Sequence, residues 1–214
     1  MNINLRITGI TSMKDSRICM SGYDMETQKY YRPVLLDQHL TDTFLHQPIG
    51  DISLFSIVTF EKNTKGIDRK PPHIEDFPIT GEVIDINNDL INDDAKKKFL
   101  SQIADEKIVD VFGHYIDVVD DHYVVLLDCG RRSLGTIVSP DCRVYLDSNG
   151  NTRVDFKDQT GFQLQNVKCV AFNKEYSKVG NYNNIPIRIS LSRAWQKPDH
   201  SEAYYWIQVS GIFP

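Results

Sequence analysis

Short runs of β-branched and aromatic residues, separated by turn-forming residues, recur along most of this chain of 214 residues. Runs of this length and composition predict β-strands, and several of them at regular spacing are typical of an all-β protein. The clearest hairpin turn is Ser148–Asn151, because its Asn-Gly step tolerates the positive φ angles of a type I′ turn. The sequence therefore predicts a mostly β fold.

One segment, Asp93–Ile103, predicts a helix instead, since acidic residues can cap its first turn and its apolar residues fall on one stripe. Strands are expected to resume at Ile108–Phe112. Five or more strands on each side of one helix indicate two small barrels of similar size. We expect an N-terminal barrel over residues 1–92, a helical connector over 93–106 and a C-terminal barrel over 107–214. Lys62–Pro78 and Asn173–Asn184 are expected to be surface loops, the first of them functional.

The net charge of −5 is unevenly distributed. The segment Asp85–Asp121 contains ten acids and four lysines and carries −6, so the rest of the chain carries +1. A locally basic face is therefore compatible with the acidic total, as is an even scatter of charge.

Catalytic and metal-binding signals are weak. Four widely spaced cysteines without a CxxC motif indicate buried thiols rather than a zinc site or disulfides. Asp120, Asp121 and His122 resemble part of a metal-binding site, but a turn before a strand explains these residues better. We expect no cofactor and no metal. The N-terminus lacks the regions of a signal peptide and no apolar run is long enough to span a membrane, so we expect a soluble cytoplasmic protein.

Basic and aromatic residues gather at both ends of the chain. Near the N-terminus, strand alternation places Tyr30 and Arg32 on one face and Lys29 and Tyr31 on the other. An exposed face of this kind can stack bases and pair with phosphates. Alternatively, a tyrosine packs in the core and Arg32 pairs with a local carboxylate.

Near the C-terminus, no acid occurs from Arg188 to Pro198. Alternation places Tyr205, Ile207 and Val209 in the core and leaves Tyr204 and Trp206 to a groove or to a seam between domains. A third basic spot, Arg131-Arg132, is either a binding element or a solvated pair. The residues predicted to contact nucleic acid are Arg17, Lys29, Tyr31, Arg32, Arg131, Arg132, Arg188, Arg193, Trp195 and Lys197.

Three segments resemble a bacterial family, the dual OB-containing domain: RICMSGYDMETQKYYRPV, GRRSLGTIVSPD, and RISLSRAWQKP with YYWIQVSGIFP. The resemblance spans nearly the whole chain. It implies two oligonucleotide/oligosaccharide-binding (OB) barrels in tandem, with nucleic-acid binding inferred from the barrel type.

Three functions remain open. The first is a non-catalytic module that binds single-stranded DNA or RNA, with binding that weakens steeply in salt. The second is an adaptor that holds a protein partner of a defence or mobile-element system through the same barrels. The third, the least supported, is a nuclease or nucleotide hydrolase that uses acids near Asp117 to Asp128.

Overall fold

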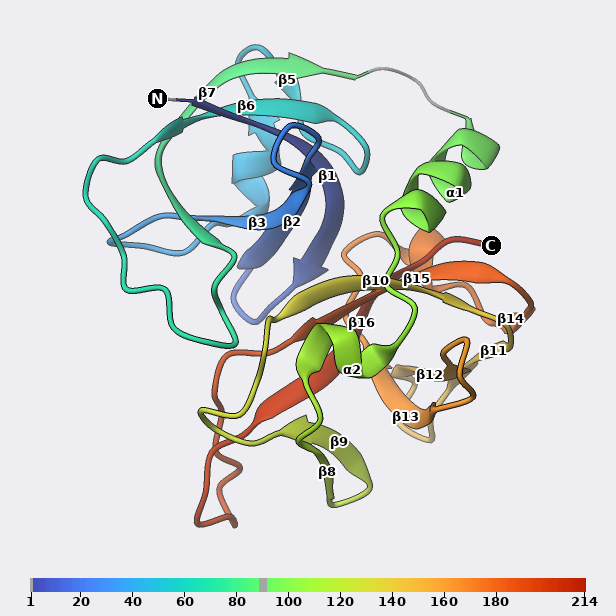
Figure 1. Ribbon diagram of the computed structural model, residues 1–214. Coiled ribbons are helices and arrows are strands. Elements are labelled where there is room, and N and C mark those ends of the chain that lie inside the picture. The colour runs from blue at the N-terminus through green and yellow to red at the C-terminus, as the bar shows by residue number, and fades with distance from the viewer. Residues whose placement is uncertain (1, 89–91) are drawn as a thin grey trace. The chain divides into compact units, whose positions relative to one another are not determined.

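The computed structural model describes residues 2–88 and 92–214, and the chain divides into two compact units (Figure 1). The first unit is Met1–Arg69 with Glu75–Asp93, and the second is Lys70–Ile74 with Asp94–Pro214. Most of the regular structure is β-strand, as predicted. Each unit is described by itself below.

The first unit is a closed barrel of five strands in the order β1-β2-β3-β7-β6. All neighbours pair antiparallel except β3 and β7, which pair parallel. A one-turn 3-10 helix and a two-stranded ribbon connect β3 to β6. The elements are β1 (Asn2–Ser12), β2 (Ile18–Asp24), β3 (Lys29–Val34), η1 (Asp42–Leu45), β4 (His46–Gln47), β5 (Gly50–Asp51), β6 (Ile57–Lys62) and β7 (Asp76–Asn87).

Side-chain alternation fills this barrel. Ile3, Leu5 and Ile7 on β1 are buried, and they join one hydrophobic cluster with Val58 and Phe60 of β6. Successive side chains of a strand point to opposite faces, so every second residue of each strand reaches the inside. Burying an aliphatic side chain of this size contributes about 1.5–3 kcal/mol, which is the main stabilising term of the barrel.

The second unit contains two helices and a nine-stranded sheet. Its helical elements are α1 (Asp93–Gln102), α2 (Ile108–Phe112) and η2 (Lys174–Ser177). Its strands are β8 (Ile116–Val119), β9 (His122–Val125), β10 (Leu134–Ser139), β11 (Cys142–Leu146), β12 (Thr152–Lys157), β13 (Gln163–Cys169), β14 (Gly180–Tyr182), β15 (Ile185–Leu191) and β16 (Tyr205–Ile212).

This sheet repeats the strand plan of the first barrel. Its order is β10-β15-β16-β13-β12-β11-β14, and only Pro140 and Asp141 separate β10 from β11 along the chain. Taken as one interrupted first strand, β10 and β11 close a ring with β12, β13, β16 and β15. As in the first barrel, the third and fifth strands, β13 and β16, pair parallel. Both units are therefore five-stranded barrels of the OB type, and the duplication is structural, without an evident sequence repeat.

The prediction of a strand at Ile108–Phe112 is wrong, because this segment is helix α2. Ile108, Val111 and Phe112 lie on one helical face and are completely buried in the core of the second unit. The buried carboxylate of Asp158 accepts a hydrogen bond from the backbone nitrogen of Ile108 at 3.0 Å. These tertiary contacts outweigh the strand propensity of a β-branched sequence.

Other local predictions are confirmed in whole or in part. The predicted helix forms as α1, which buries Phe99 and Leu100. The Asn-Gly segment joins β11 to β12 as a hairpin, but it is not a type I′ turn, because Gly150 has a φ of 77° and Asn149 has no positive φ. The expected surface loop Lys62–Pro78 is only partly confirmed. It connects β6 to β7, but Pro72, His73 and 75–78 are buried, and the residues from Asp76 already belong to β7.

Candidate nucleic-acid interface

A row of four polar side chains crosses the outer face of the second barrel. The register pairs Tyr145 of β11 with Arg153 of β12, Arg153 with Lys168 of β13, and Lys168 with Gln208 of β16. Directly opposed residues of a sheet point to the same face, so the four side chains lie side by side. All four are partly or fully exposed.

The opposite face of the same strands is the barrel core. Val144, Val154 and Val167 are paired across β11, β12 and β13 and are buried. Each is the chain neighbour of a residue in the polar row. The period of two in these strands therefore places the row outside the barrel.

The turn between β11 and β12 holds Arg153 in place. Arg153 donates through Nε to Asp147 Oδ2 at 2.8 Å, and Asp147 also accepts from the backbone nitrogens of Asn149 and Asn151. The hydrogen bond from Arg153 and those from Asn151 and Asn149 hold the pKa of Asp147 well below its ordinary value. The turn thus fixes a guanidinium at the centre of the row.

Tyr145 supplies an aromatic surface at one end of the row. The guanidinium of Arg143 lies 5.1 Å from its ring centroid, and its hydroxyl donates to Asp155 Oδ1 at 3.2 Å. Burial and the Asp155 carboxylate raise the pKa of Tyr145. The ring is therefore neutral and held from both sides.

Aromatic side chains gather around Trp206 of β16. We define this aromatic cluster as Trp195, Tyr204, Trp206 and His122. Trp206 shares the face of Gln208 by strand alternation, and its ring centroid is 5.8 Å from that of Trp195. Tyr204 and His122 each approach Trp206 at 6.1 Å. Trp206 is 9% exposed and Trp195 is 52% exposed, so Trp195 is the ring that solvent reaches.

The aromatic cluster lies in a positively charged environment and next to the polar row. Lys197 Nζ lies 4.8 Å from the ring centroid of Trp206. Burial lowers the pKa of His122, and the charges of Arg153 and Lys197 lower it further. Trp206 and Gln208 are two residues apart on β16 and share one face, so the aromatic cluster adjoins the polar row.

The connection between β15 and β16, residues 192–204, holds Trp195 rigidly. Trp195 and Tyr204 exchange both backbone hydrogen bonds, at 3.0 and 3.1 Å, and the indole nitrogen of Trp206 donates to Trp195 O at 3.1 Å. The far end of this loop is fixed to Asp120, which accepts from Lys197 and His200. Hydrogen bonds from Lys197 and His200 lower the pKa of Asp120. The loop presents a preorganised aromatic ring.

Two of the residues predicted at the N-terminal end are wholly or partly buried. Arg32 is 4% exposed and forms an ion pair with Asp76 at 3.0 Å. Tyr31 packs against the core of the first barrel, 5.6 Å from Phe77. Of the two alternatives that the sequence left open, the second holds: the buried guanidinium of Arg32 pairs with a carboxylate, so its exposure is excluded, and the ring of Tyr31 packs against the barrel core.

The other two N-terminal candidates stay at the surface. Lys29 is exposed at the start of β3. Arg17 is partly exposed and lies 3.4 Å from the exposed Asp15. Tyr30, predicted on the opposite face from Tyr31, is buried and makes an edge contact with Tyr23 at 5.0 Å.

The structure separates the C-terminal candidates as well. Arg188 is completely buried and donates to Gly135 O at 2.7 Å and Thr136 Oγ1 at 3.1 Å, so its predicted exposure is wrong. Its strand β15 is central in the sheet, between β10 and β16, and every residue of it is buried. Two of the C-terminal candidates, Trp195 and Lys197, lie close together, because both contact the ring of Trp206.

Arginines on loops have mixed environments. Arg131 and Arg193 are exposed. Arg132 forms a short ion pair with Asp105 and is partly buried. The predicted basic pair at Gly130 therefore presents one exposed guanidinium, that of Arg131.

Sequence reasoning missed the polar row of Tyr145, Arg153, Lys168 and Gln208. A signal was present, because polar and apolar residues alternate strictly in CRVYL and in RVDFK on either side of the Asn-Gly turn. Such alternation marks a strand with one buried and one solvent-facing side. The alternation does not reveal that β12 pairs with β13 and that β13 pairs with β16. This pairing assembles the row.

Within residues 2–88 and 92–214, no group of three or more His, Cys, Asp or Glu side chains is arranged to hold a metal ion. Asp120 and Asp121 both have positive φ and form the turn between β8 and β9, as predicted. All four cysteines are free thiols, of which Cys142 is buried and the others are half-buried. No helix in the described part of the chain has the length and apolarity to cross a membrane.

Two five-stranded barrels, with an aromatic and basic outer face on the second, define a tandem OB-barrel protein. The family model for the Dual OB-containing domain matches residues 10–212. The chain therefore belongs to the Dual OB-containing domain family, as its sequence resemblance predicts. No curated protein and no solved structure matches the chain.

Proposed function

We propose that the protein is a non-catalytic module that binds single-stranded DNA or RNA on the outer face of the second barrel. The observation that carries this proposal is the continuity of the polar row with the aromatic cluster. OB barrels use the outer face of their second and third strands, here β12 and β13, and the connection between the fourth and fifth strands, here residues 192–204.

In this proposal Trp195 stacks on a base, because it is the exposed ring of the aromatic cluster. Tyr145 offers a second aromatic surface at the other end of the row. Stacking of a base on an aromatic side chain is worth about 1–3 kcal/mol and tolerates any sequence. Two rigid rings separated by cations suit a flexible strand whose bases and phosphates alternate.

The phosphates are proposed to contact Arg143, Arg153, Lys168 and Lys197. Arg153 and Lys197 each share their charge with one carboxylate, Asp147 and Asp120. Lys168 and Arg143 form no ion pair with a carboxylate in the described part of the chain. A phosphate can therefore bind these two cations without competing with a carboxylate of the protein. The exposed Arg17, Lys29, Arg131 and Arg193 remain proposed contacts of lower priority.

The test is fluorescence anisotropy with labelled single-stranded DNA, single-stranded RNA and duplex DNA, between about 50 and 200 mM salt. We expect tighter binding to single strands and affinity that falls with salt. Trp195→Ala is expected to weaken binding about 5- to 150-fold, the equivalent of about 1–3 kcal/mol. For single strands, Lys168→Ala should reduce the slope of log affinity against log salt by about 0.7.

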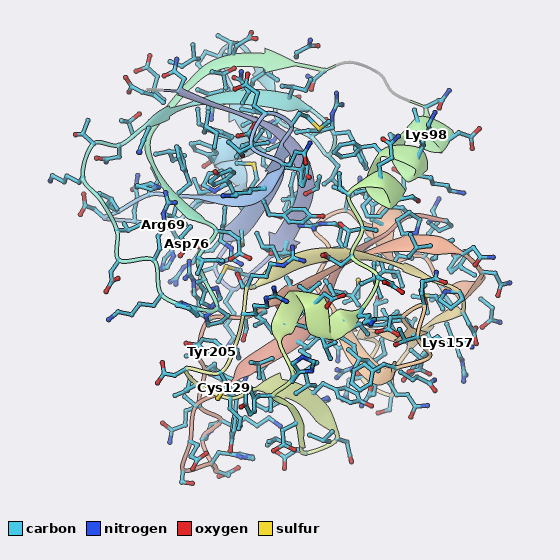
Figure 2. The ribbon with its side chains drawn as sticks, in the orientation of Figure 1. Arg69, Asp76, Lys98, Cys129, Lys157 and Tyr205 are labelled. Atoms are coloured by element: carbon cyan, nitrogen blue, oxygen red, sulfur yellow. The ribbon has the colours of Figure 1, made fainter. Side chains whose placement is uncertain are left out.

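Lys98→Ala is the control, because Lys98 is an exposed lysine on α1, outside the polar row and the aromatic cluster (Figure 2). Wild-type affinity in the Trp195 variant would refute the proposed site. Absence of any binding at low salt would refute nucleic-acid binding and favour the protein-adaptor alternative.

A further inference from the structure

The connection between β6 and β7 in the first barrel carries a concentration of positive charge. Residues 62–70 contain Lys62, Lys65, Arg69 and Lys70 against a single acid, Asp68, in a chain whose net charge is −5. Lys65 and Arg69 are exposed and Lys62 is half-exposed. Solvent and ligands therefore reach these cations.

Two of the cations approach the same aromatic ring. Lys62 Nζ lies 5.7 Å and Arg69 Cζ lies 5.9 Å from the ring centroid of Phe77. Phe77 is 7% exposed and its ring packs edge-on against Tyr31, so the ring is a fixed platform. Figure 2 shows Arg69 in the loop that leads to Asp76 at the start of β7.

Neither cation is neutralised within the described part of the chain. No ion pair joins Lys62 or Arg69 to a carboxylate among residues 2–88 and 92–214. A cation–π contact at an exposed site is worth only about 0.5–1 kcal/mol and leaves the positive charge in place. Two like charges held near one ring create a local potential that favours an anion.

The second barrel has the same arrangement at the corresponding place. Residues 63–75 join the fourth and fifth strands of the first barrel, and residues 192–204 join the fourth and fifth strands of the second. Phe77 is the second residue of β7, and Trp206, under Lys197, is the second residue of β16. A cation over the aromatic residue that opens the fifth strand is therefore a feature of both barrels.

We infer that Lys62 and Arg69 form a second phosphate-binding site, on the first barrel, that takes phosphodiester or other phosphoryl groups of a polyanion. A guanidinium and an ammonium positioned on one platform bind phosphate oxygens by charge-assisted hydrogen bonds. The inference rests on the proposed function only for the source of the phosphate, which is the backbone of the bound strand.

Two probes separate the source of the phosphate. Inorganic tripolyphosphate contains no bases and tests the anion site alone. Its binding is followed by the NMR signal of the Arg69 Nε–H in proteins that keep this arginine, and by isothermal titration calorimetry in all variants. An oligo(dT) tests the strand, followed by anisotropy across a salt series. The variants are Lys62→Gln, Arg69→Gln and their double, with Lys98→Gln as the matched control and thermal melts to confirm that each protein is folded.

We expect tripolyphosphate to shift the Arg69 signal of the wild-type protein. Its affinity, measured by calorimetry, should be at least about tenfold weaker in Arg69→Gln, which corresponds to the loss of one charge-assisted contact. For oligo(dT), loss of two phosphate contacts should reduce the salt slope by about 1.4 in the double variant. Lys98→Gln should change neither value.

The outcomes distinguish the two proposals. If tripolyphosphate binds through Arg69 and the oligonucleotide does not bind, the phosphate site stands and the proposed function fails. If the oligonucleotide binds with an unchanged salt slope in the double variant and tripolyphosphate leaves the Arg69 signal unmoved, the phosphate site is wrong and the proposed function stands. If neither probe binds, both are wrong.

Discussion

Lys197 donates a hydrogen bond from Nζ to Asp120 Oδ2 at 2.9 Å, although 77 positions separate the two residues in the chain. His200 reaches the same carboxylate oxygen at 2.7 Å. Asp120 belongs to the turn between β8 and β9, and the two donors belong to the loop that carries Trp195. One carboxylate therefore connects a small hairpin to the loop proposed to stack a base.

The Asp120→Asn variant should loosen the loop of residues 192–204. The amide removes the negative charge that Lys197 and His200 share, so the loop end loses its charged partner. We expect faster hydrogen exchange at Gln196–Tyr204, measured by mass spectrometry on the free protein. Asp121→Asn is the control, since Asp121 is exposed in the same turn and makes no comparable contact. Identical exchange in the two variants would show that Asp120 does not hold the loop.

Acid should weaken the turn that positions Arg153. The pKa of Asp147 is lowered in the folded protein from an ordinary value of 3.8, chiefly by Arg153. A depressed folded-state pKa means that the stabilising contribution is complete above the unfolded pKa and is lost as the pH falls through the folded one. Thermal melts from pH 7 to below pH 3 should show wild type less stable on acidification. The melting temperature of Asp147→Asn should lie below that of wild type at pH 7, and this difference should shrink over the same pH range. A difference that does not change with pH would contradict the prediction.

Two thiols should resist alkylation in the native protein. Burial raises the pKa of Cys142 to about 12 and that of Cys169 to about 11. Because the thiolate is the nucleophile, roughly one molecule in ten thousand of Cys142 and one in a thousand of Cys169 are reactive at pH 8. Iodoacetamide followed by peptide mass spectrometry should label them slowly in buffer and fully in denaturant. Rapid native labelling of Cys142 would contradict its burial.

Arg32→Ala should destabilise the protein rather than act through a lost ligand contact. Arg32 and Asp76 form a buried ion pair, and removing one partner of such a pair costs about 3–5 kcal/mol of folding free energy. Urea denaturation measures this loss. Arg17→Ala is the matched control, because its exposed pair with Asp15 is worth at most about 1 kcal/mol. Equal losses in the two variants would refute the structural role of Arg32.

Predictions from the sequence succeeded where one segment decides its own structure. The Asn-Gly turn and the amphipathic helix α1 are local patterns, and both form. Alternation also placed Tyr31 opposite Tyr30, and Ile207 and Val209 in the core. These results follow from the period of a strand or a helix, which any short stretch of chain carries.

Predictions failed or stayed open where a distant residue decides the outcome. The sequence left open whether Arg32 is a surface cation or pairs with a carboxylate, and its partner Asp76 lies 44 positions away in the chain. Arg188 looked like part of an exposed basic segment, but its strand lies between two others in the sheet. Ile108–Phe112 looked like a strand, but Asp158 and the core of the second unit stabilise it as a helix.

The sequence by itself determined the mostly β character, the family, and the positions of the helix α1 and the main turn, because these depend on patterns between near neighbours. Only the tertiary structure decided which cations are buried and which are exposed. It also decided that the row of Tyr145, Arg153 and Lys168 continues toward Trp195 and Lys197. Those facts depend on strand register between segments far apart in the chain, where a shift of one residue turns a side chain from solvent to core.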